Sequence, residues 1–204
     1  MSDGGPLERR AAFLDRDGVI NIDHGYVFRR EDFNFVPGVL EGARRLRQLG
    51  FALVVITNQS GIGRGLYSVG DYEQLTSWMM AQFNEAGAPL AGVYYCPHHP
   101  TEAQGEYRRS CDCRKPAPGL LLASARELGL DLAASVLFGD KESDLLAARA
   151  AGIPVRVLLG TDARSIPPAL ASPGLATAAF RRLDEALADT ALLAALHTPS
   201  PVSE

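Results

Sequence analysis

Short apolar runs alternate along this chain with amphipathic segments, and polar residues follow most of the runs. The run 51–56 (FALVVI) is continuous and rich in β-branched residues, and it leads into Thr57. Runs of this kind predict strands that are covered on both faces. We therefore expect strands at 11–14, 51–56, 92–95, 135–138 and 155–159.

The segments between the runs carry apolar residues at helical spacing. In 38–50 the apolar residues lie about one helical turn apart, with arginines between them and a final glycine. That pattern is typical of an amphipathic helix with a glycine stop. Asp71 and Gln74 stand at capping-box positions, and Pro118 suits a first helical turn. The expected helices are 38–50, 71–86, 118–128, 142–151 and 183–196.

The alternation of strands and helices predicts the fold class. Strand–helix–strand units form right-handed crossovers, so the sheet should be mainly parallel, with helices on both faces. We expect a Rossmann-like three-layer α/β sandwich whose ligands bind at the carboxyl ends of the strands. A single domain should cover 11–197, between flexible tails at 1–10 and 198–204. The chain contains no internal repeat.

Composition and charge narrow the classes of partner. The 204 residues are 47% hydrophobic and 22% charged, as in soluble globular proteins. The net charge of -4 argues against nucleic-acid and anionic-membrane partners, which usually require a basic excess. No apolar run reaches the roughly 18 to 20 residues of a membrane span, and no signal-peptide core is present near the start. We expect a cytoplasmic monomer that binds neither membranes nor nucleic acids.

Two carboxylates follow the first predicted strand directly, in the segment 15–18 (DRDG). In an extended chain Asp15 and Asp17 would share a face, whereas in a turn the Asp17 carbonyl could face a cation. Both geometries create an oxygen-rich site of the kind that hard divalent cations prefer. A solvated acidic turn is the commoner origin of an isolated DxD pattern. The interpretation therefore depends on the other polar clusters.

Three more polar clusters occur farther along the chain. The segment 57–61 (TNQSG) offers a hydroxyl, amides and backbone N–H groups that can hold phosphate oxygens. Arg114 and Lys115 supply cations that can balance the oxygens of a phosphoryl group. Asp140 follows the strand 135–138 and can complete a magnesium shell. Each cluster alone could be an ordinary turn or surface pair, but their combination in this order is specific.

The ordered clusters resemble those of phosphatases in the haloacid dehalogenase (HAD) superfamily. The matching stretches are DRDGVI, TNQSG, RKP and GDKESD, and the resemblance extends from Phe13 to about Leu159. Within the superfamily, DRDGVINIDHGYV, FALVVITNQSGIGRG, YYCPHHP and CDCRKPAPG are more similar to heptose bisphosphate phosphatases than to the histidinol-phosphate phosphatase domain. The intervals between 17 and 57 and between 57 and 115 are too short for a full cap domain, so specificity should come from loops.

The resemblance implies a reaction with a role for each matching residue. Asp15 would attack phosphorus and become an aspartyl-phosphate, and Asp17 would protonate the leaving alkoxide and then activate water. Thr57 and Lys115 would steady the phosphoryl group. A Mg²⁺ ion would be held by the Asp15 carboxylate, the Asp17 carbonyl and Asp140.

The implied substrate is a small sugar bisphosphate. The enzyme would remove the C7 phosphate of D-glycero-D-manno-heptose 1,7-bisphosphate, in the synthesis of ADP-heptose for the lipopolysaccharide core. The expected substrate-binding residues are Asp23, His24, Gly25, Tyr26, Thr57, Asn58, Gln59, Ser60, Arg114, Lys115 and Lys141.

The three cysteines lie close together and predict a metal site. With one histidine they form the pattern C-x-H, twelve residues, C-x-C, made by Cys96, His98, Cys111 and Cys113. The members of each pair are two positions apart, so in extended backbone both side chains point the same way and four ligands can surround zinc. The segment between them has little to bury, although ordering it costs about 1 to 2 kcal/mol per residue. A structural zinc contributes on the order of 10 to 16 kcal/mol in small peptides. Heptose phosphatases carry such a loop, so we predict a structural Zn²⁺ in the zinc loop, 96–113, with His99 as the alternative to His98.

Three alternative functions stay open for the same residues. Histidinol-phosphate phosphatase or a broad sugar-phosphate phosphatase would use the same chemistry. A zinc-binding module without catalysis accounts for the cysteines but leaves the acids and Lys115 without a role. A nucleic-acid 3′-phosphatase shares the DxDG pattern, but the acidic charge balance disfavours it.

Overall fold

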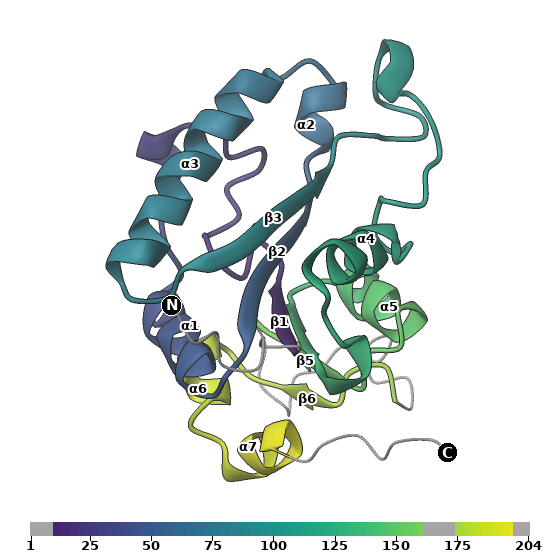
Figure 1. Cartoon of the computed structure of the whole chain (residues 1–204). Coiled ribbons are helices and arrows are strands. Elements are labelled where there is room, and N and C mark those ends of the chain that lie inside the picture. The colour runs from purple at the N-terminus through teal and green to yellow at the C-terminus, as the bar shows by residue number, and fades with distance from the viewer. Residues whose placement is uncertain (1–9, 161–173, 198–204) are drawn as a thin grey trace, which may run out of the picture.

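A six-stranded parallel sheet forms the centre of the molecule, with strand order β3-β2-β1-β4-β5-β6 (Figure 1). The structure is a computed structural model that describes residues 10–160 and 174–197. The predicted tails therefore lie outside the described residues, apart from Arg10. The strands are β1 (Ala11–Leu14), β2 (Ala52–Asn58), β3 (Leu90–Cys96), β4 (Val136–Gly139), β5 (Val155–Leu158) and β6 (Ala178–Ala179).

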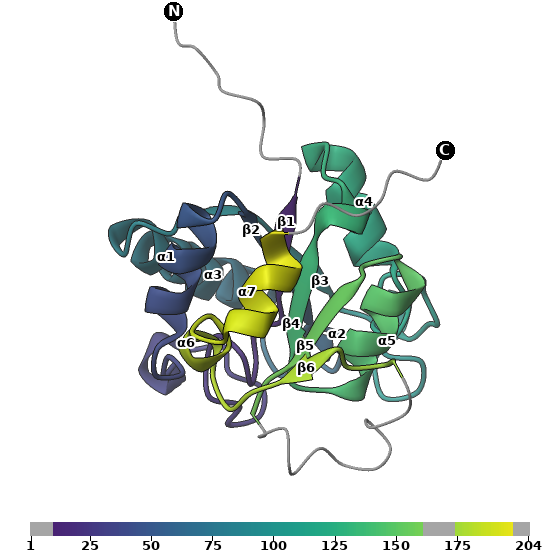
Figure 2. The same ribbon diagram turned by 90° about the horizontal axis from the view of Figure 1, so that it is seen from below.

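Helices cover both faces of this sheet, as Figure 2 shows. The α-helices are α1 (Val39–Gln48), α2 (Ser60–Gly63), α3 (Val69–Glu85), α4 (Gly119–Leu128), α5 (Glu142–Ala150), α6 (Leu183–Ala186) and α7 (Thr190–His197). The described residues also form three short 3-10 helices, each between a strand and an α-helix: η1 (Arg30–Asp32), η2 (Gly105–Tyr107) and η3 (Leu132–Ala134). Among the helices in the described part of the chain, none combines the length and apolar character needed to cross a bilayer.

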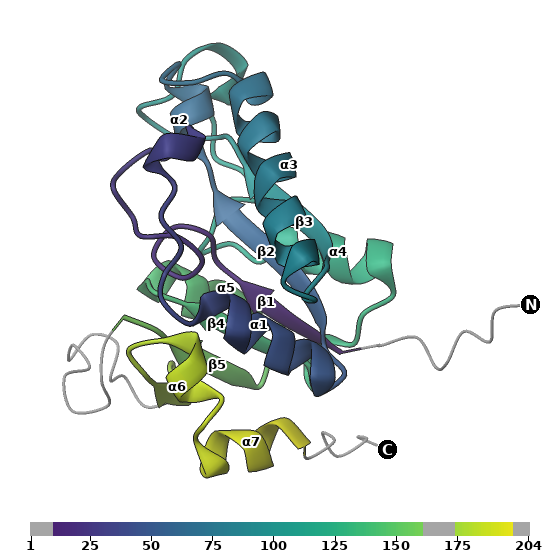
Figure 3. The same ribbon diagram turned by 90° about the vertical axis from the view of Figure 1, so that its left-hand side faces the viewer.

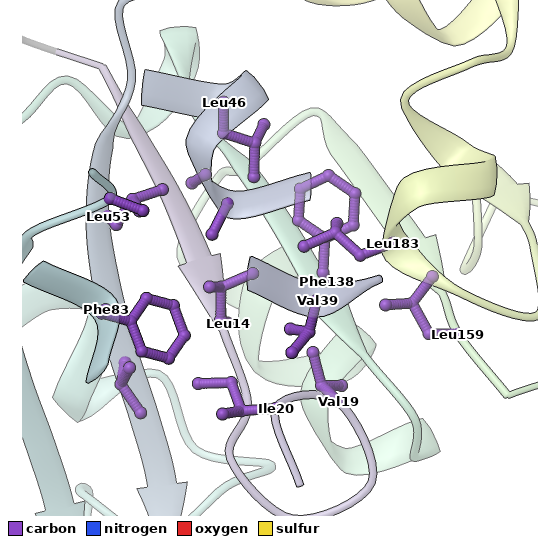
Figure 4. Close-up of a cluster of buried hydrophobic side chains, with 14 of the residues drawn as sticks. Leu14, Val19, Ile20, Val39, Leu46, Leu53, Phe83, Phe138, Leu159 and Leu183 are labelled. Atoms are coloured by element: carbon purple, nitrogen blue, oxygen red, sulfur yellow. The ribbon is translucent and has the colours of Figure 1, made fainter. Parts of the chain in front are cut away.

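Two hydrophobic layers form because successive strand residues point to opposite faces of the sheet. On one face Leu14 and Phe138 pack with Leu46 of α1, and Phe83 of α3 joins the same cluster (Figure 4). On the other face Phe13 belongs to a second cluster, which includes residues of α4 and α5. Fully burying a side chain of this size contributes roughly 1.5–3 kcal/mol. The two layers therefore fix the strands whose ends carry the polar residues.

The structure confirms the predicted fold class, and each predicted strand and most predicted helices occur within a few residues of their expected positions. The sequence pattern missed α2, the 3-10 helices and β6. Such elements are too short to show a period. The order β2-β1-β4 places the first predicted strand in the middle of the sheet. The polar residues that follow β1, β2 and β4 consequently meet at the carboxyl end of these strands.

Two helix boundaries differ from the prediction. The last helix is split into α6 and α7, because Asp189 accepts a hydrogen bond from the Leu192 N–H (2.8 Å) and starts a new helix. The capping box of α3 is formed by Ser68 and Asp71, not by Asp71 and Gln74. The Ser68 hydroxyl accepts from the Asp71 N–H at 3.1 Å, and the Asp71 carboxylate accepts from the Ser68 N–H at 2.9 Å.

The two ends of the sheet are covered differently. Figure 3 shows α2 and the segment after β1 at one end, and α6 and α7 towards the other. The arrows of β2 and β3 in Figure 1 point towards α2, so this is the carboxyl end of the strands. Ligands of open parallel sheets bind at this end.

Candidate active site

A buried lysine joins two acids at the carboxyl edge of the sheet. Lys115 Nζ lies 2.8 Å from Asp15 Oδ1 and 2.7 Å from Asp144 Oδ1. It also donates a hydrogen bond to the Ile56 carbonyl oxygen at 2.9 Å. Burial by itself would lower the pKa of Lys115, but the two carboxylates outweigh burial and raise the pKa above its usual value. Lys115 is therefore a fixed cation beside the Asp15 carboxylate.

Three carboxylates gather around the same point and suit a divalent cation. Oxygen atoms of Asp15, Asp140 and Asp144 lie within 4.8 Å of one another. Burial, with neighbouring carboxylates, raises the pKa of Asp15 to about 6 and that of Asp140 to about 7. Asp140 Oδ1 is buried and has no hydrogen-bond partner among the described residues. A cation would neutralise the repulsion and satisfy this oxygen, so these residues fit Mg²⁺.

The Asp17 carboxylate is surrounded by hydrogen-bond donors. Oδ1 accepts from Arg16 Nη2 at 2.9 Å and from Asn21 Nδ2 at 3.0 Å. Oδ2 accepts from Gln59 Nε2 at 2.9 Å, and the same amide nitrogen donates to Thr57 Oγ1 at 2.8 Å. The second acid of the DxD pattern is thus connected through Gln59 to the hydroxyl that follows β2.

A cavity of about 530 Å³ opens above these acids. It brings together ten of the eleven predicted substrate-binding residues, namely Asp23, Gly25, Tyr26, Thr57, Asn58, Gln59, Ser60, Arg114, Lys115 and Lys141. Asp15 and Asp17 also line it. Loops that are far apart in the sequence therefore form one concave site.

His24 is the exception, because it does not line this cavity. Its side chain is exposed, hydrogen-bonds to Asn34 Oδ1 at 3.0 Å and lines a separate hollow. The chain turns here through positive φ angles at Gly25 (78°) and Tyr26 (53°), so neighbouring side chains leave in different directions. Asp23 instead faces the cavity, where its carboxylate accepts a hydrogen bond from Lys141 Nζ at 3.0 Å.

Several residues of the cavity wall had no site role in the prediction: Arg64 and Tyr67, and also Ser143 and Asp144 of the GDKESD stretch. Arg64 forms an ion pair with Glu102 of the zinc loop, and its guanidinium lies 5.4 Å from the centre of the Tyr26 ring. These residues lie close in sequence to the TNQSG segment or to Asp140, and that closeness was the signal that could have identified them. The directions of their side chains depend on the turn through α2 and on the packing of α5.

The four predicted zinc ligands converge on one point. Cys113 Sγ lies 3.2 Å from both Cys96 Sγ and Cys111 Sγ, and 3.3 Å from His98 Nδ1. Disulfide sulfurs are about 2.05 Å apart, so these are separate thiols. A tetrahedron with bonds of about 2.3 Å has edges of about 3.8 Å, so the four atoms need to move apart only slightly to surround a zinc ion. Three sulfurs and one ring nitrogen fit Zn²⁺, whereas His99 Nδ1 accepts from backbone N–H groups outside this cluster.

The zinc loop also packs on α2, which the sequence pattern did not predict. The Gln104 N–H donates to the Gly63 carbonyl at 2.7 Å, and Ala103 is buried. Arg114 Nη1 donates to the His98 carbonyl at 3.1 Å. The loop that holds the cysteines is therefore tied both to α2 and to a cation of the cavity.

Five features together define a hydrolase of the HAD class. They are the sheet order, the acid after β1, the hydroxyl after β2, the lysine before α4 and the acid after β4. A family model described as HAD-hydrolase-like matches residues 112–186. The chain is 52% identical over 151 residues to the D-glycero-beta-D-manno-heptose-1,7-bisphosphate 7-phosphatase of Photorhabdus laumondii, covering 74% of this chain and 80% of that protein. It is 49% identical to the enzyme of the same name from Escherichia coli K12, over 78% of this chain and 83% of that one.

Solved structures agree with these similarities. The D,D-heptose 1,7-bisphosphate phosphatase of B. bronchiseptica, complexed with magnesium and phosphate, superposes with a TM-score of 0.74 and 30% sequence identity. The match covers 91% of this chain and 99% of that chain. This chain belongs to the D-glycero-beta-D-manno-heptose-1,7-bisphosphate 7-phosphatase family of the HAD superfamily. It is a phosphoric monoester hydrolase, as its resemblance to HAD phosphatases implied.

Proposed function

We propose that this protein hydrolyses the C7 phosphate of D-glycero-D-manno-heptose 1,7-bisphosphate through a covalent intermediate on Asp15. The observation that carries the proposal is the buried Asp15 carboxylate, paired with Lys115 at 2.8 Å on the floor of the cavity. A carboxylate that faces a cavity beside a fixed cation can attack a phosphorus atom whose oxygens that cation attracts.

The first half-reaction forms the intermediate. An Asp15 oxygen attacks phosphorus, the bond between phosphorus and the C7 oxygen breaks, and Asp17 gives its proton to the departing oxygen. Thr57 Oγ1 and Lys115 Nζ hold the oxygens of the phosphoryl group during this transfer. The leaving sugar therefore departs as a neutral alcohol.

The second half-reaction restores the enzyme. A water molecule attacks the phosphorus of the aspartyl-phosphate while Asp17 takes up one of its protons. The bond between phosphorus and Asp15 breaks, and inorganic phosphate leaves. Mg²⁺, when bound, would be held by the carboxylates of Asp15 and Asp140 and by the Asp17 carbonyl, and it would supply positive charge that balances the phosphoryl group.

The choice of a bisphosphate substrate is supported by the relatives and by the charges of the cavity. The relatives from Photorhabdus laumondii and Escherichia coli K12 are named heptose-1,7-bisphosphate 7-phosphatases, and their names specify the β form. Arg64, Arg114 and Lys141 line the cavity in addition to Lys115. These cations can bind a second phosphate that is retained on C1. We further propose that the enzyme is a monomer that works in the cytoplasm, in ADP-heptose synthesis for lipopolysaccharide.

We further propose that Zn²⁺ bound by Cys96, His98, Cys111 and Cys113 is structural. Four protein ligands leave no open position for substrate or water. The metal would fix Cys113, and Arg114 and Lys115 follow it directly in the chain. The zinc loop would therefore set the position of two cations in the cavity.

The test replaces the proposed nucleophile and identifies the product. Asp15→Asn keeps the side-chain shape but is expected to lower phosphate release by at least about a thousandfold, with circular dichroism confirming that the variant is folded. Both anomers of the heptose bisphosphate, histidinol phosphate and a 3′-phosphorylated oligonucleotide are compared with the parent enzyme. Phosphorus NMR should show that C7 loses its phosphate and C1 keeps it. Parental turnover by Asp15→Asn, or preferred hydrolysis of another substrate, would refute the proposal.

A further inference from the structure

A chain of hydrogen bonds connects Asp17 to a tyrosine that lies outside the sequence motifs. Tyr67 Oη donates to Gln59 Oε1 at 2.6 Å. The amide nitrogen of Gln59 then donates to Asp17 Oδ2 at 2.9 Å and to Thr57 Oγ1 at 2.8 Å. Both ends of the Gln59 amide are therefore used.

The chemistry of the tyrosine fixes the direction of this chain. Tyr67 is 6% exposed, and burial raises the pKa of its phenol above the usual value, so the hydroxyl keeps its proton. A phenol that keeps its proton donates it to the best acceptor nearby, which here is the carbonyl oxygen of Gln59. Once that oxygen faces Tyr67, the two amide hydrogens of Gln59 must face Asp17 and Thr57.

Packing holds the tyrosine ring in place. The ring stacks on Phe28, with centroids 5.1 Å apart and an interplanar angle of 11°. It also lies against Gly61 of the TNQSG segment, where an added Cβ would stand 2.1 Å from Tyr67 Cε1. The hydroxyl position is thus set by a rigid ring.

We propose that Tyr67 is a positioning residue for Asp17, acting through Gln59. This inference rests on the proposed function, in which Asp17 transfers a proton to the leaving sugar oxygen. Tyr67 keeps the amide of Gln59 in the orientation in which its nitrogen donates to both Asp17 Oδ2 and Thr57 Oγ1. Without the tyrosine hydroxyl the Gln59 oxygen loses this donor, and the amide is less firmly oriented towards Asp17 and Thr57.

If Asp17 protonates the leaving group, the effect of misplacing Asp17 should depend on which group leaves. A sugar alkoxide is a poor leaving group and needs the proton, whereas p-nitrophenolate leaves readily without one. A fault in positioning Asp17 should therefore slow transfer from the sugar phosphate and spare transfer from p-nitrophenyl phosphate. A general loss of structure or of magnesium would affect both substrates alike.

The experiment compares kcat/KM of Tyr67→Phe on heptose 1,7-bisphosphate and on p-nitrophenyl phosphate, since this parameter reports only the steps up to phosphoryl transfer. We expect about a tenfold loss on the sugar phosphate, which is part of the roughly 10²- to 10⁴-fold that a general acid contributes, and less than a twofold loss on the aryl phosphate. The ratio of the two values is unaffected by any fraction of unfolded protein. Tyr72→Phe is the matched control, because Tyr72 is also buried but takes no part in this hydrogen-bond chain. Equal losses on the two substrates, or no loss, would overturn the inference.

Asp17→Asn separates this inference from the proposed function. In the first turnover it should release heptose monophosphate slowly and p-nitrophenolate at nearly the parental rate. If Asp17→Asn lacks this selectivity, the acid role assigned to Asp17 fails and the inference fails with it. If Asp17→Asn is selective and Tyr67→Phe is not, the proposed function stands and the role of Tyr67 alone is wrong.

Discussion

Gly18 and Asp140 are so close that a Cβ atom built on Gly18 would stand 2.1 Å from Asp140 Oδ2. Gly18 also has a φ of +96°, a conformation that side chains other than glycine rarely adopt. The turn after β1 can therefore approach the acid after β4 only because position 18 lacks a side chain. This close approach brings together residues from two neighbouring strands that both contribute to the magnesium site we propose.

Gly18→Ala should weaken magnesium binding by displacing Asp140. We expect the Mg²⁺ concentration for half-maximal activity to rise by about tenfold or more, because a ligand moved by about 1 Å loses much of its contribution. Gly152→Ala is the matched control: its φ is +81°, but nothing lies within 4 Å of an added Cβ. Both variants should lose roughly 1–2 kcal/mol of stability through backbone strain. An unchanged magnesium requirement in Gly18→Ala would contradict this role.

The stability of the metal-free protein should fall as pH rises from about 4 to 7. The pKa values of Asp15 and Asp140 are raised to about 6 and about 7, above the ordinary value of 3.8. In this window the folded state holds more protons than the unfolded state, so the free energy of unfolding decreases with rising pH. Mg²⁺ binds the ionised acids and should stabilise the protein more at pH 8 than at pH 5.

Thermal unfolding in EDTA and in excess Mg²⁺, at several pH values, measures both effects. Asp140→Asn should flatten the pH dependence of the metal-free protein, because it removes one of the two titrating acids. A metal-free protein whose stability rises through this window would show that the acids are ionised at lower pH than stated.

Loss of one zinc ligand should lower activity as well as stability. In Cys111→Ala the proposed zinc would lose a ligand, and Arg114 and Lys115 follow the cluster directly in the chain. We expect substoichiometric zinc, a lower unfolding temperature and at least a tenfold lower kcat, since small displacements of catalytic groups are costly. His99→Ala, beside a ligand but outside the cluster, should keep its zinc. A folded, zinc-free Cys111→Ala protein with unchanged turnover would refute the coupling.

Asp144→Asn should slow the reaction by releasing Lys115. Asp144 Oδ1 lies 2.7 Å from Lys115 Nζ, and removal of its charge leaves Asp15 as the remaining carboxylate partner of this buried cation. We expect kcat to fall by about tenfold or more, with a smaller change in KM, because the lysine would act on the phosphoryl group in transit. Asp131→Asn, at the start of η3, is the control and should keep parental kinetics. Parental kcat in Asp144→Asn would show that Lys115 needs no second partner.

Most of the sheet and its polar edge could be predicted from the sequence because their signals are local. The strand runs end at Asp15 and Thr57 or just before Asp140, and parallel strands bring such ends together. The cluster of three cysteines and His98 could also be predicted, because the members of each pair are separated by one residue and that spacing is itself the signal. The roles of these residues in catalysis stay predictions until the variants are measured.

The remaining features depend on backbone turns and packing that no periodic pattern encodes. The His24 side chain lies outside the cavity because Gly25 and Tyr26 adopt positive φ angles. A tyrosine is not a residue type that predicts a positive φ. Tyr67 reaches Gln59 only because α2 folds the chain back over the TNQSG segment. Tertiary geometry, not residue type, decided both outcomes.

The central place of β1 has a consequence for biosynthesis. β1 pairs with β2 on one side and with β4 on the other, and β4 begins only at Val136. While the ribosome extends the chain, β1 cannot pair with β4 until Val136 has emerged. One edge of β1 therefore stays unpaired, and unpaired strand edges attract other chains. A prematurely terminated product would thus carry Asp15, the proposed nucleophile, without Asp140, and we expect it to be inert and prone to aggregate.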